Sequence, residues 1–281
     1  MTRRWIIGLL SLCLMVMLGW SGRLAQAIAP LQPVETVSEL PSLPAVVALE
    51  PRPVLAAGPT DFALPALPRG VPPSDDTPAN GILMAQATPR QVVALADPSN
   101  YGDRFATDAN GQPLTQDFIA VLHETVGSAQ SAINLFRTYH SRDADQVSYH
   151  TLIGRDGTIY YIVPPEKRAF GAGNSVFNGP NGPETARMNP NFPPSVNNFA
   201  YHVSLETPGD GMNNRRSHSG YTQAQYTSLA WLLAQTTIPD NRITTHQSVD
   251  RSGNRIDPRS FNRQQLLTLL RQYPNRTGLS G

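Results

Sequence analysis

The chain has 281 residues, and its 22 Lys and Arg against 21 Asp and Glu give a formal net charge of +1. This balance argues against a nucleic-acid-binding protein, which would need a basic face. Cysteine occurs once, as Cys13, which excludes an internal disulfide and a thiolate-rich zinc cluster, so any metal site must use His and carboxylate ligands.

The first 27 residues have the three regions of a secretory signal. Arg3 and Arg4 precede an uncharged apolar run of 16 residues, 5–20, and the small-x-small sequence at 25–27 is typical of a signal-peptidase site. The run is shorter than the roughly 20 residues that cross a bilayer. We therefore expect cleavage after Ala27 and no stable membrane insertion afterwards, with a retained anchor as the alternative. The protein is predicted to be exported to the periplasm or cell envelope.

Residues 28–100 are rich in proline and poor in aromatic residues. This segment holds 14 prolines in 73 residues and a single aromatic residue, Phe62. Proline removes backbone donors and favours extended chain. A segment with so few large apolar side chains cannot bury enough surface to offset the entropy of folding. We interpret 28–100 as a linker that is disordered or semi-rigid.

Residues 101–275 are predicted to form one folded domain, and 276–281 a short tail. Short β-rich runs and segments with apolar residues at helical spacing alternate along this part of the chain. In chain order they predict a strand at 118–122, a helix at 128–139, strands at 149–153, 158–163 and 199–205, a helix at 222–235, a strand at 243–245 and a last helix capped by Ser260.

Turn and capping signals support these elements. Asp156-Gly157 is a strong hairpin-turn signal between the strands at 149–153 and 158–163. Thr222 and Gln225 have the spacing of a capping box, and the Gly-, Pro- and Asn-rich segment 171–198 is expected to be a long loop that borders a site. The order of elements predicts an α/β fold, with a mixed central β-sheet flanked by helices.

Polar side chains follow several of the predicted strands. His123, Glu206 and His246 each come directly after a strand, and Asp257 lies 11 residues beyond His246. Ligands of open α/β sheets gather at the carboxyl ends of the strands, so these residues would share one rim if their strands run in one direction. Two imidazoles and one carboxylate are a common ligand set for catalytic zinc, and a nearby glutamate could act as a general base.

Several stretches of the chain resemble the zinc-dependent N-acetylmuramoyl-L-alanine amidases that share a fold with peptidoglycan-recognition proteins, and they occur in the same order as in that family. The most specific is SYHTLIGRDGTIY at 148–160, which is similar to a hairpin of that family; the others lie at 121–125, 163–173, 203–206, 245–246 and 255–258. The resemblance spans 117–271. It implies the family's fold, a Zn²⁺ cofactor, and hydrolysis of the amide bond between N-acetylmuramic acid and L-alanine in peptidoglycan or muropeptides.

The resemblance also implies roles for single residues. His123, His246 and Asp257 match the zinc ligands of the family. Glu206 matches the glutamate that activates the attacking water, and Tyr149 matches a tyrosine that lines the site.

Three positions depart from the family pattern. Arg255 stands where many members have a lysine that stabilises the transition state, and arginine keeps the charge without the compact ammonium group. Gly171 replaces a histidine, and Arg259 replaces a glycine after Asp257-Pro258.

The other histidines carry weaker signals. His150 and His202 are read either as hydrogen-bonded strand residues or as neighbours of the site, because His202 lies on the same strand face as Glu206. His140 and His218 are expected to be solvated.

Three other classes of protein fit the sequence less well. A non-catalytic peptidoglycan-binding module is the main alternative, and the presence of all three candidate ligands and the glutamate disfavours it. A zinc peptidase that cuts the stem peptide is disfavoured because no H-E-x-x-H motif is present. A lysozyme would need paired carboxylates across a cleft. Only Glu206 is well placed for that role, which disfavours a lysozyme. Sequence indicates neither the oligomeric state nor whether the substrate is intact sacculus or soluble fragments.

Overall fold

The computed structural model describes residues 88–276 and 279. Within them, a mixed sheet has the strand order β1-β5-β4-β9-β3-β10. Its strands are β1 (Gln91–Val93), β3 (Ile119–Glu124), β4 (Thr151–Ile153), β5 (Ile159–Tyr161), β9 (Ala200–Leu205) and β10 (Ile243–Thr245). All neighbouring pairs are parallel except β4 and β5, which form the predicted antiparallel hairpin. The predicted fold class is confirmed.

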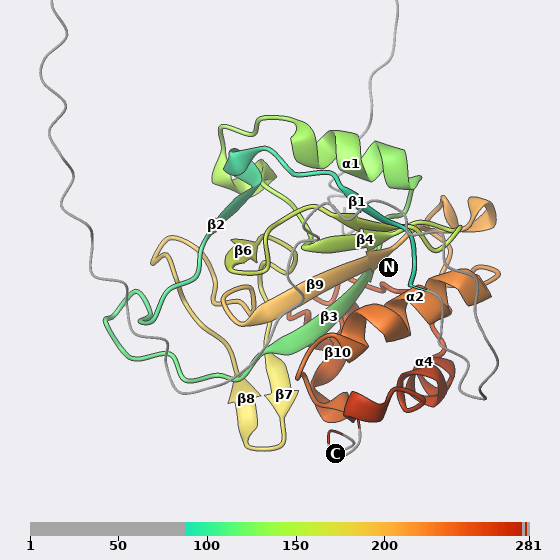
Figure 1. Ribbon diagram of the computed structural model, residues 1–281. Coiled ribbons are helices and arrows are strands. Elements are labelled where there is room, and N and C mark those ends of the chain that lie inside the picture. The colour runs from blue at the N-terminus through green and yellow to red at the C-terminus, as the bar shows by residue number, and fades with distance from the viewer. Residues whose placement is uncertain (1–87, 277–278, 280–281) are drawn as a thin grey trace, which may run out of the picture. The chain divides into compact units, whose positions relative to one another are not determined.

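The two faces of the sheet have different coverings. The helices α2 (Gln223–Ala234) and α4 (Arg263–Leu270) lie on one face, and α1 (Ala129–Arg137) lies on the other (Figure 1). Side chains of β3 alternate between the faces: Ala120 and Leu122 pack into the core under α2 and α4, while Ile119 and Val121 pack against the loop that includes Val196. His123 therefore lies on the face that α1 and this loop cover.

Local sequence signals account for the helix starts. Ser128 caps α1, and Thr222 and Gln225 form the predicted capping box of α2. The prediction for α4 was wrong by two residues, because Asn262 and not Ser260 accepts the hydrogen bond from the first turn. A further short helix, α3 (His246–Val249), follows β10 directly, and short 3₁₀ helices occupy Pro98–Asn100, Asp143–Asp145, Gly209–Gly211, Asp240–Arg242 and Pro274–Arg276.

Several three-residue strands were not predicted. β2 (Tyr101–Asp103) pairs with β6 (Lys167–Ala169), and β7 (Phe177–Gly179) pairs with β8 (Gly182–Glu184) inside the expected loop. β1 lies within the segment interpreted as a linker, so the folded domain begins before residue 101. The predicted signal at 1–27, linker residues 28–87 and most of the tail lie outside the described residues. No helix in the described part is both long and apolar enough to span a bilayer.

Candidate metal centre

His123, His246 and Asp257 meet at one end of the sheet. Each offers a ligand atom, and these atoms all lie within 4.8 Å of one another. His246 Nδ1 is 3.1 Å from Asp257 Oδ2, and His123 Nδ1 is 3.5 Å from the same oxygen. The convergence has a simple cause, because β3 and β10 are adjacent and parallel, so their carboxyl ends bring His123 and His246 together.

The donor set fits a divalent cation such as zinc. Ligand atoms around a tetrahedral ion at about 2.0–2.1 Å are about 3.3 Å apart, close to both distances to Asp257 Oδ2. His123 Nδ1 is buried and makes no hydrogen bond within the described residues, an arrangement that costs free energy unless another group satisfies the nitrogen. Neutral imidazole nitrogens and a carboxylate oxygen are ligands that zinc prefers.

Electrostatics favour the ligating protonation states. Burial, and after it the nearby His246, lowers the pKa of His123 to about 4. Burial acts to raise the pKa of Asp257, but its interactions with His123 and His246 outweigh burial and hold that pKa well below its usual range. At neutral pH, His123 is therefore neutral and Asp257 is ionised.

A cavity of about 710 Å³ adjoins these residues. His246, Asp257, Tyr149 and Arg255 line it. The Tyr149 ring stacks on the His123 ring with 4.4 Å between centroids, and burial raises the pKa of Tyr149. Five of the six predicted site residues thus lie together.

Glu206 is placed differently. Its side chain is absent from the lining of this cavity, and its two oxygens accept hydrogen bonds from the backbone N–H groups of Ala129, at 3.0 Å, and Arg155, at 2.9 Å. The carboxylate thus binds the N-terminus of α1 and the β4–β5 turn. The sheet register explains the position, because the residue of β9 that pairs with His123 is Ser204.

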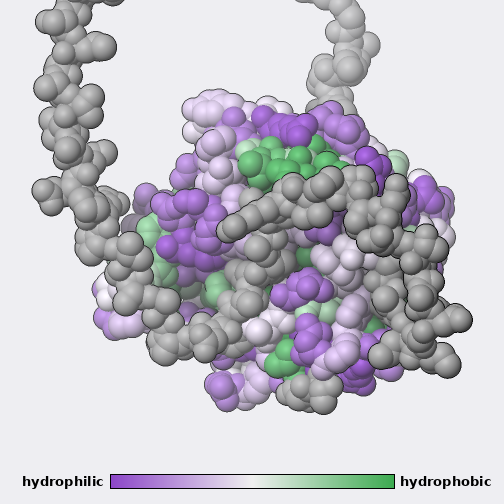
Figure 2. All heavy atoms as spheres, viewed as in Figure 1, coloured by the Kyte–Doolittle hydropathy of each residue, from purple (hydrophilic) through white to green (hydrophobic). Residues whose placement is uncertain are grey.

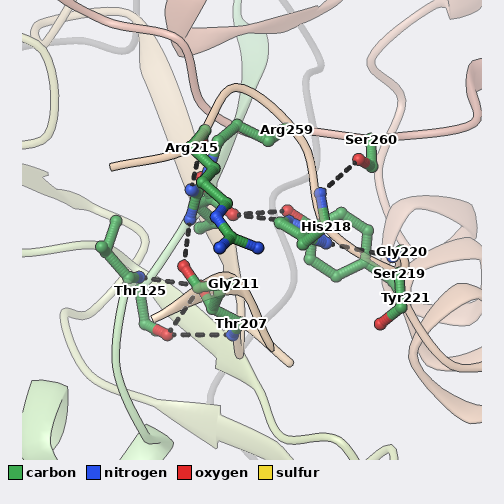
Figure 3. Close-up of polar contacts among 12 residues, drawn as sticks. Thr125, Thr207, Gly211, Arg215, His218, Ser219, Gly220, Tyr221, Arg259 and Ser260 are labelled. Atoms are coloured by element: carbon green, nitrogen blue, oxygen red, sulfur yellow. Dashed lines mark hydrogen bonds and ion pairs between the residues drawn. The ribbon is translucent and has the colours of Figure 1, made fainter. Parts of the chain in front are cut away.

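A buried ion pair, missed in the sequence, supports the ligand-bearing segments. Glu124 follows His123 and pairs with Arg259 at 2.5 Å, and both side chains are almost fully buried. Arg259 also donates to carbonyl oxygens of the 207–221 loop, including those of Gly211 and Arg215 (Figure 3). The pair therefore joins the end of β3 to the segment that carries Asp257.

The same cluster corrects one expectation. His218, expected to be solvated, has a fully buried side chain whose Nε2 lies 3.0 Å from Glu124 Oε2. Tyr221 donates to the same oxygen at 3.1 Å. One sequence signal could have located this cluster of Glu124, Arg259, His218 and Tyr221. It is the arginine at position 259, where the family pattern has a glycine, because a charged side chain there needs a partner.

The remaining surface is mixed in character. Most of the coloured surface in Figure 2 is hydrophilic, with a smaller apolar group near α1. Among the described residues, the exposed large apolar or aromatic side chains include Leu135 of α1 and Tyr139 just after it.

Residues 116–260 match the family described as N-acetylmuramoyl-L-alanine amidase, and the chain belongs to this family. The enzyme class expected from the sequence is thereby confirmed. No curated protein matches the sequence.

Solved structures similar to the chain include other amidases. A selenomethionine derivative of AmpD has 24% identity, with 66% of this chain and 95% of AmpD covered and a TM-score of 0.45. The N-acetylmuramoyl-L-alanine amidase LysC from Clostridium intestinale has 20% identity, coverage of 66% and 99%, and a TM-score of 0.41. AmpDh3 from Pseudomonas aeruginosa, solved in complex with an anhydromuramic pentapeptide, has 20% identity, coverage of 58% and 65%, and a TM-score of 0.40.

Proposed function

We propose that this amidase uses a zinc ion held by His123, His246 and Asp257 to hydrolyse the amide bond between N-acetylmuramic acid and L-alanine in peptidoglycan or muropeptides. The observation that carries the proposal is the convergence of two imidazoles and a carboxylate beside the cavity. The orphaned Nδ1 of buried His123 supports it independently, since a bound cation would satisfy that atom.

The residues around the cavity suit hydrolysis of an amide. His123, His246 and Asp257 would hold a zinc ion, which would supply a Lewis acid for the scissile carbonyl and for an attacking water. Arg255 brings a positive charge to the cavity wall, where it stabilises the oxyanion that develops during attack. Tyr149, whose phenol stays protonated because burial raises its pKa, is a second hydrogen-bond donor in the same wall.

The lining also suits a ligand with both sugar and peptide parts. Aromatic rings of Phe170 and Phe192 offer apolar contact, and the side chains of Asn174 and Asn189 can pair with amide or hydroxyl groups. Together with the predicted export signal, this mixture of aromatic and polar lining residues favours a substrate in the cell envelope. The linker that precedes the domain would give the domain the reach to bind that substrate. We accordingly propose a periplasmic or envelope location.

The proton acceptor of the proposed mechanism is predicted from the resemblance. The resemblance gives this role to Glu206, whose carboxylate here binds backbone N–H groups of Ala129 and Arg155. This role stays a prediction.

Product analysis tests the proposal. Purified peptidoglycan and soluble muropeptides are incubated with the enzyme, with and without a chelator, and the products are identified by mass spectrometry. We expect intact stem peptides that begin with L-alanine, and we expect the chelator to abolish their release until zinc is restored. Release that persists in the chelator, from protein shown to be metal-free, would remove zinc from the proposal.

The ligand set has its own test. His246→Ala should bind zinc much more weakly and lose muropeptide release, while His140→Ala, a matched change of a histidine outside the cavity, should retain both. Undiminished turnover of His246→Ala would exclude His246 as a ligand.

A further inference from the structure

His202 is a buried histidine that the proposed mechanism does not use. It lies on β9 on the same face as His123, and its side chain is inaccessible to solvent. His202 Nδ1 is 2.9 Å from His123 Nε2, and His202 Nε2 is 3.0 Å from Asn197 Oδ1. The three side chains thus form a continuous hydrogen-bonded relay that ends on a candidate metal ligand.

The direction of every hydrogen bond in this relay is fixed by the backbone. The N–H of Ala172 donates to Asn197 Oδ1 at 2.9 Å, which identifies that atom as the oxygen. An amide oxygen only accepts, so His202 Nε2 carries the proton and His202 Nδ1 is an acceptor. His123 Nε2 must then carry the proton that His202 accepts. The remaining nitrogen, His123 Nδ1, is left with its lone pair on the side of Asp257.

Room for the His202 ring depends on a glycine. A Cβ atom at Gly171 would lie 2.6 Å from both Cγ and Nδ1 of His202, closer than real contacts allow. The backbone of Gly171 is not in the left-handed region, so its requirement for glycine is spatial. Gly171 is also a position where the resembling family has histidine, and any such side chain would collide with the His202 ring. The two residues therefore belong to one arrangement.

We propose that His202 is a positioning residue, which holds His123 in the tautomer and orientation that present Nδ1 to the metal, and that Gly171 provides the space it needs. The inference rests on the proposed zinc site. A ligating histidine is usually held by a carboxylate or backbone carbonyl at its second nitrogen, and loss of such a partner weakens metal binding about 10- to 100-fold. In this chain a second imidazole, itself held by Asn197, has that task.

The first test compares zinc affinity in variants of His202, measured by competition with a chromophoric chelator on the purified protein. His202→Leu keeps most of the volume and removes the acceptor, and we expect the Kd for zinc to rise about 10- to 100-fold. His202→Asn keeps an acceptor near the place of Nδ1 and should recover part of that loss. His140→Asn, a change of a half-buried histidine that hydrogen-bonds Asn100 and lies outside the cavity, is the matched control and should stay within about threefold of wild type.

A second test displaces the His202 ring through Gly171 and compares the effect with and without that ring. Gly171→Ala should displace the His202 ring and raise the Kd for zinc, and it should have no further effect when His202→Ala has already removed the ring. An unchanged Kd in Gly171→Ala, or equal effects in both backgrounds, would overturn the inference.

The tautomers can be observed without metal. In ¹⁵N spectra of histidine-labelled, metal-free protein, His123 and His202 should both carry the proton on Nε2, and an Nδ1–H tautomer at either residue would refute the relay. The outcomes separate the two proposals. If wild type and His202→Leu bind zinc equally tightly, only the positioning role of His202 is overturned. If wild type binds no zinc, the proposed function is overturned together with this role.

Discussion

Replacement of Arg259 by Met should destabilise the domain far more than loss of an ordinary surface ion pair. Arg259 and Glu124 are almost fully buried, and Arg259→Met leaves the Glu124 carboxylate without its cationic partner. The freed carbonyl oxygens of Asn213 and Arg215 belong to residues that are partly or fully exposed, so water can replace those bonds, whereas the carbonyl of buried Gly211 also loses its donor. The cost therefore comes mainly from the uncompensated buried charge, for which about 3–5 kcal/mol is typical.

Urea denaturation followed by far-ultraviolet circular dichroism measures this cost. Arg142→Met is the matched control, because Arg142 pairs with Asp145 through side chains that are 74% and 48% exposed. Such a pair is worth at most about 1 kcal/mol. The double variant Glu124→Gln, Arg259→Met should lose less than the two single variants together, because the stranded charge is gone. If Arg259→Met costs less than about 1 kcal/mol, the assignment of a strong buried ion pair is wrong.

Three further predictions concern the site. Removal of zinc with a chelator should lower the midpoint of thermal unfolding, and His246→Ala should show no such shift, because a ligand that binds only the folded state stabilises it. In metal-free protein, the pKa of His123 is 6.5 when unfolded and about 4 when folded, so the unfolded chain binds the extra proton and stability falls as the pH drops from 6.5 to 4. The loss is about 3 kcal/mol, and urea titrations should show a correspondingly smaller loss for His123→Asn. Glu206→Gln should lower kcat about 10²- to 10⁴-fold at unchanged zinc content if Glu206 accepts the proton, and an unchanged kcat would exclude that role.

Sequence patterns correctly predicted those parts of the fold that depend on interactions between residues close together in the chain. The turn at Asp156-Gly157 and the capping box at Thr222 both use residues within four positions of one another, and the structure has both. The strand at 243–245 was predicted from Ile243 and two threonines, whereas β2 and β6 contain no β-branched residue and no apolar run, so they were missed.

The site likewise has features that local sequence patterns predict and features that depend on residues far apart in the chain. Parallel strands made it predictable that His123 and His246 would meet, because each follows a run of strand residues. The burial of His218 was not predictable, since it depends on Glu124, which is 94 residues away in the chain. The relay through His202 depends on Asn197 and on the space above Gly171, and neither leaves a periodic signal in the sequence.

The position of Glu206 shows why the order of residues along a strand does not fix a site. Ser204 pairs with His123, and Glu206 is two residues further along the chain, just past the end of β9; two residues span roughly 7 Å on a strand. To reach the ligands, the carboxylate would have to leave the N–H groups of Ala129 and Arg155, and with them the N-terminus of α1. Glu206→Gln should therefore lower the free energy of unfolding by about 1 kcal/mol whatever its catalytic role. A fall in kcat beyond what that loss of folded protein explains would mean that the carboxylate moves to the cavity during turnover.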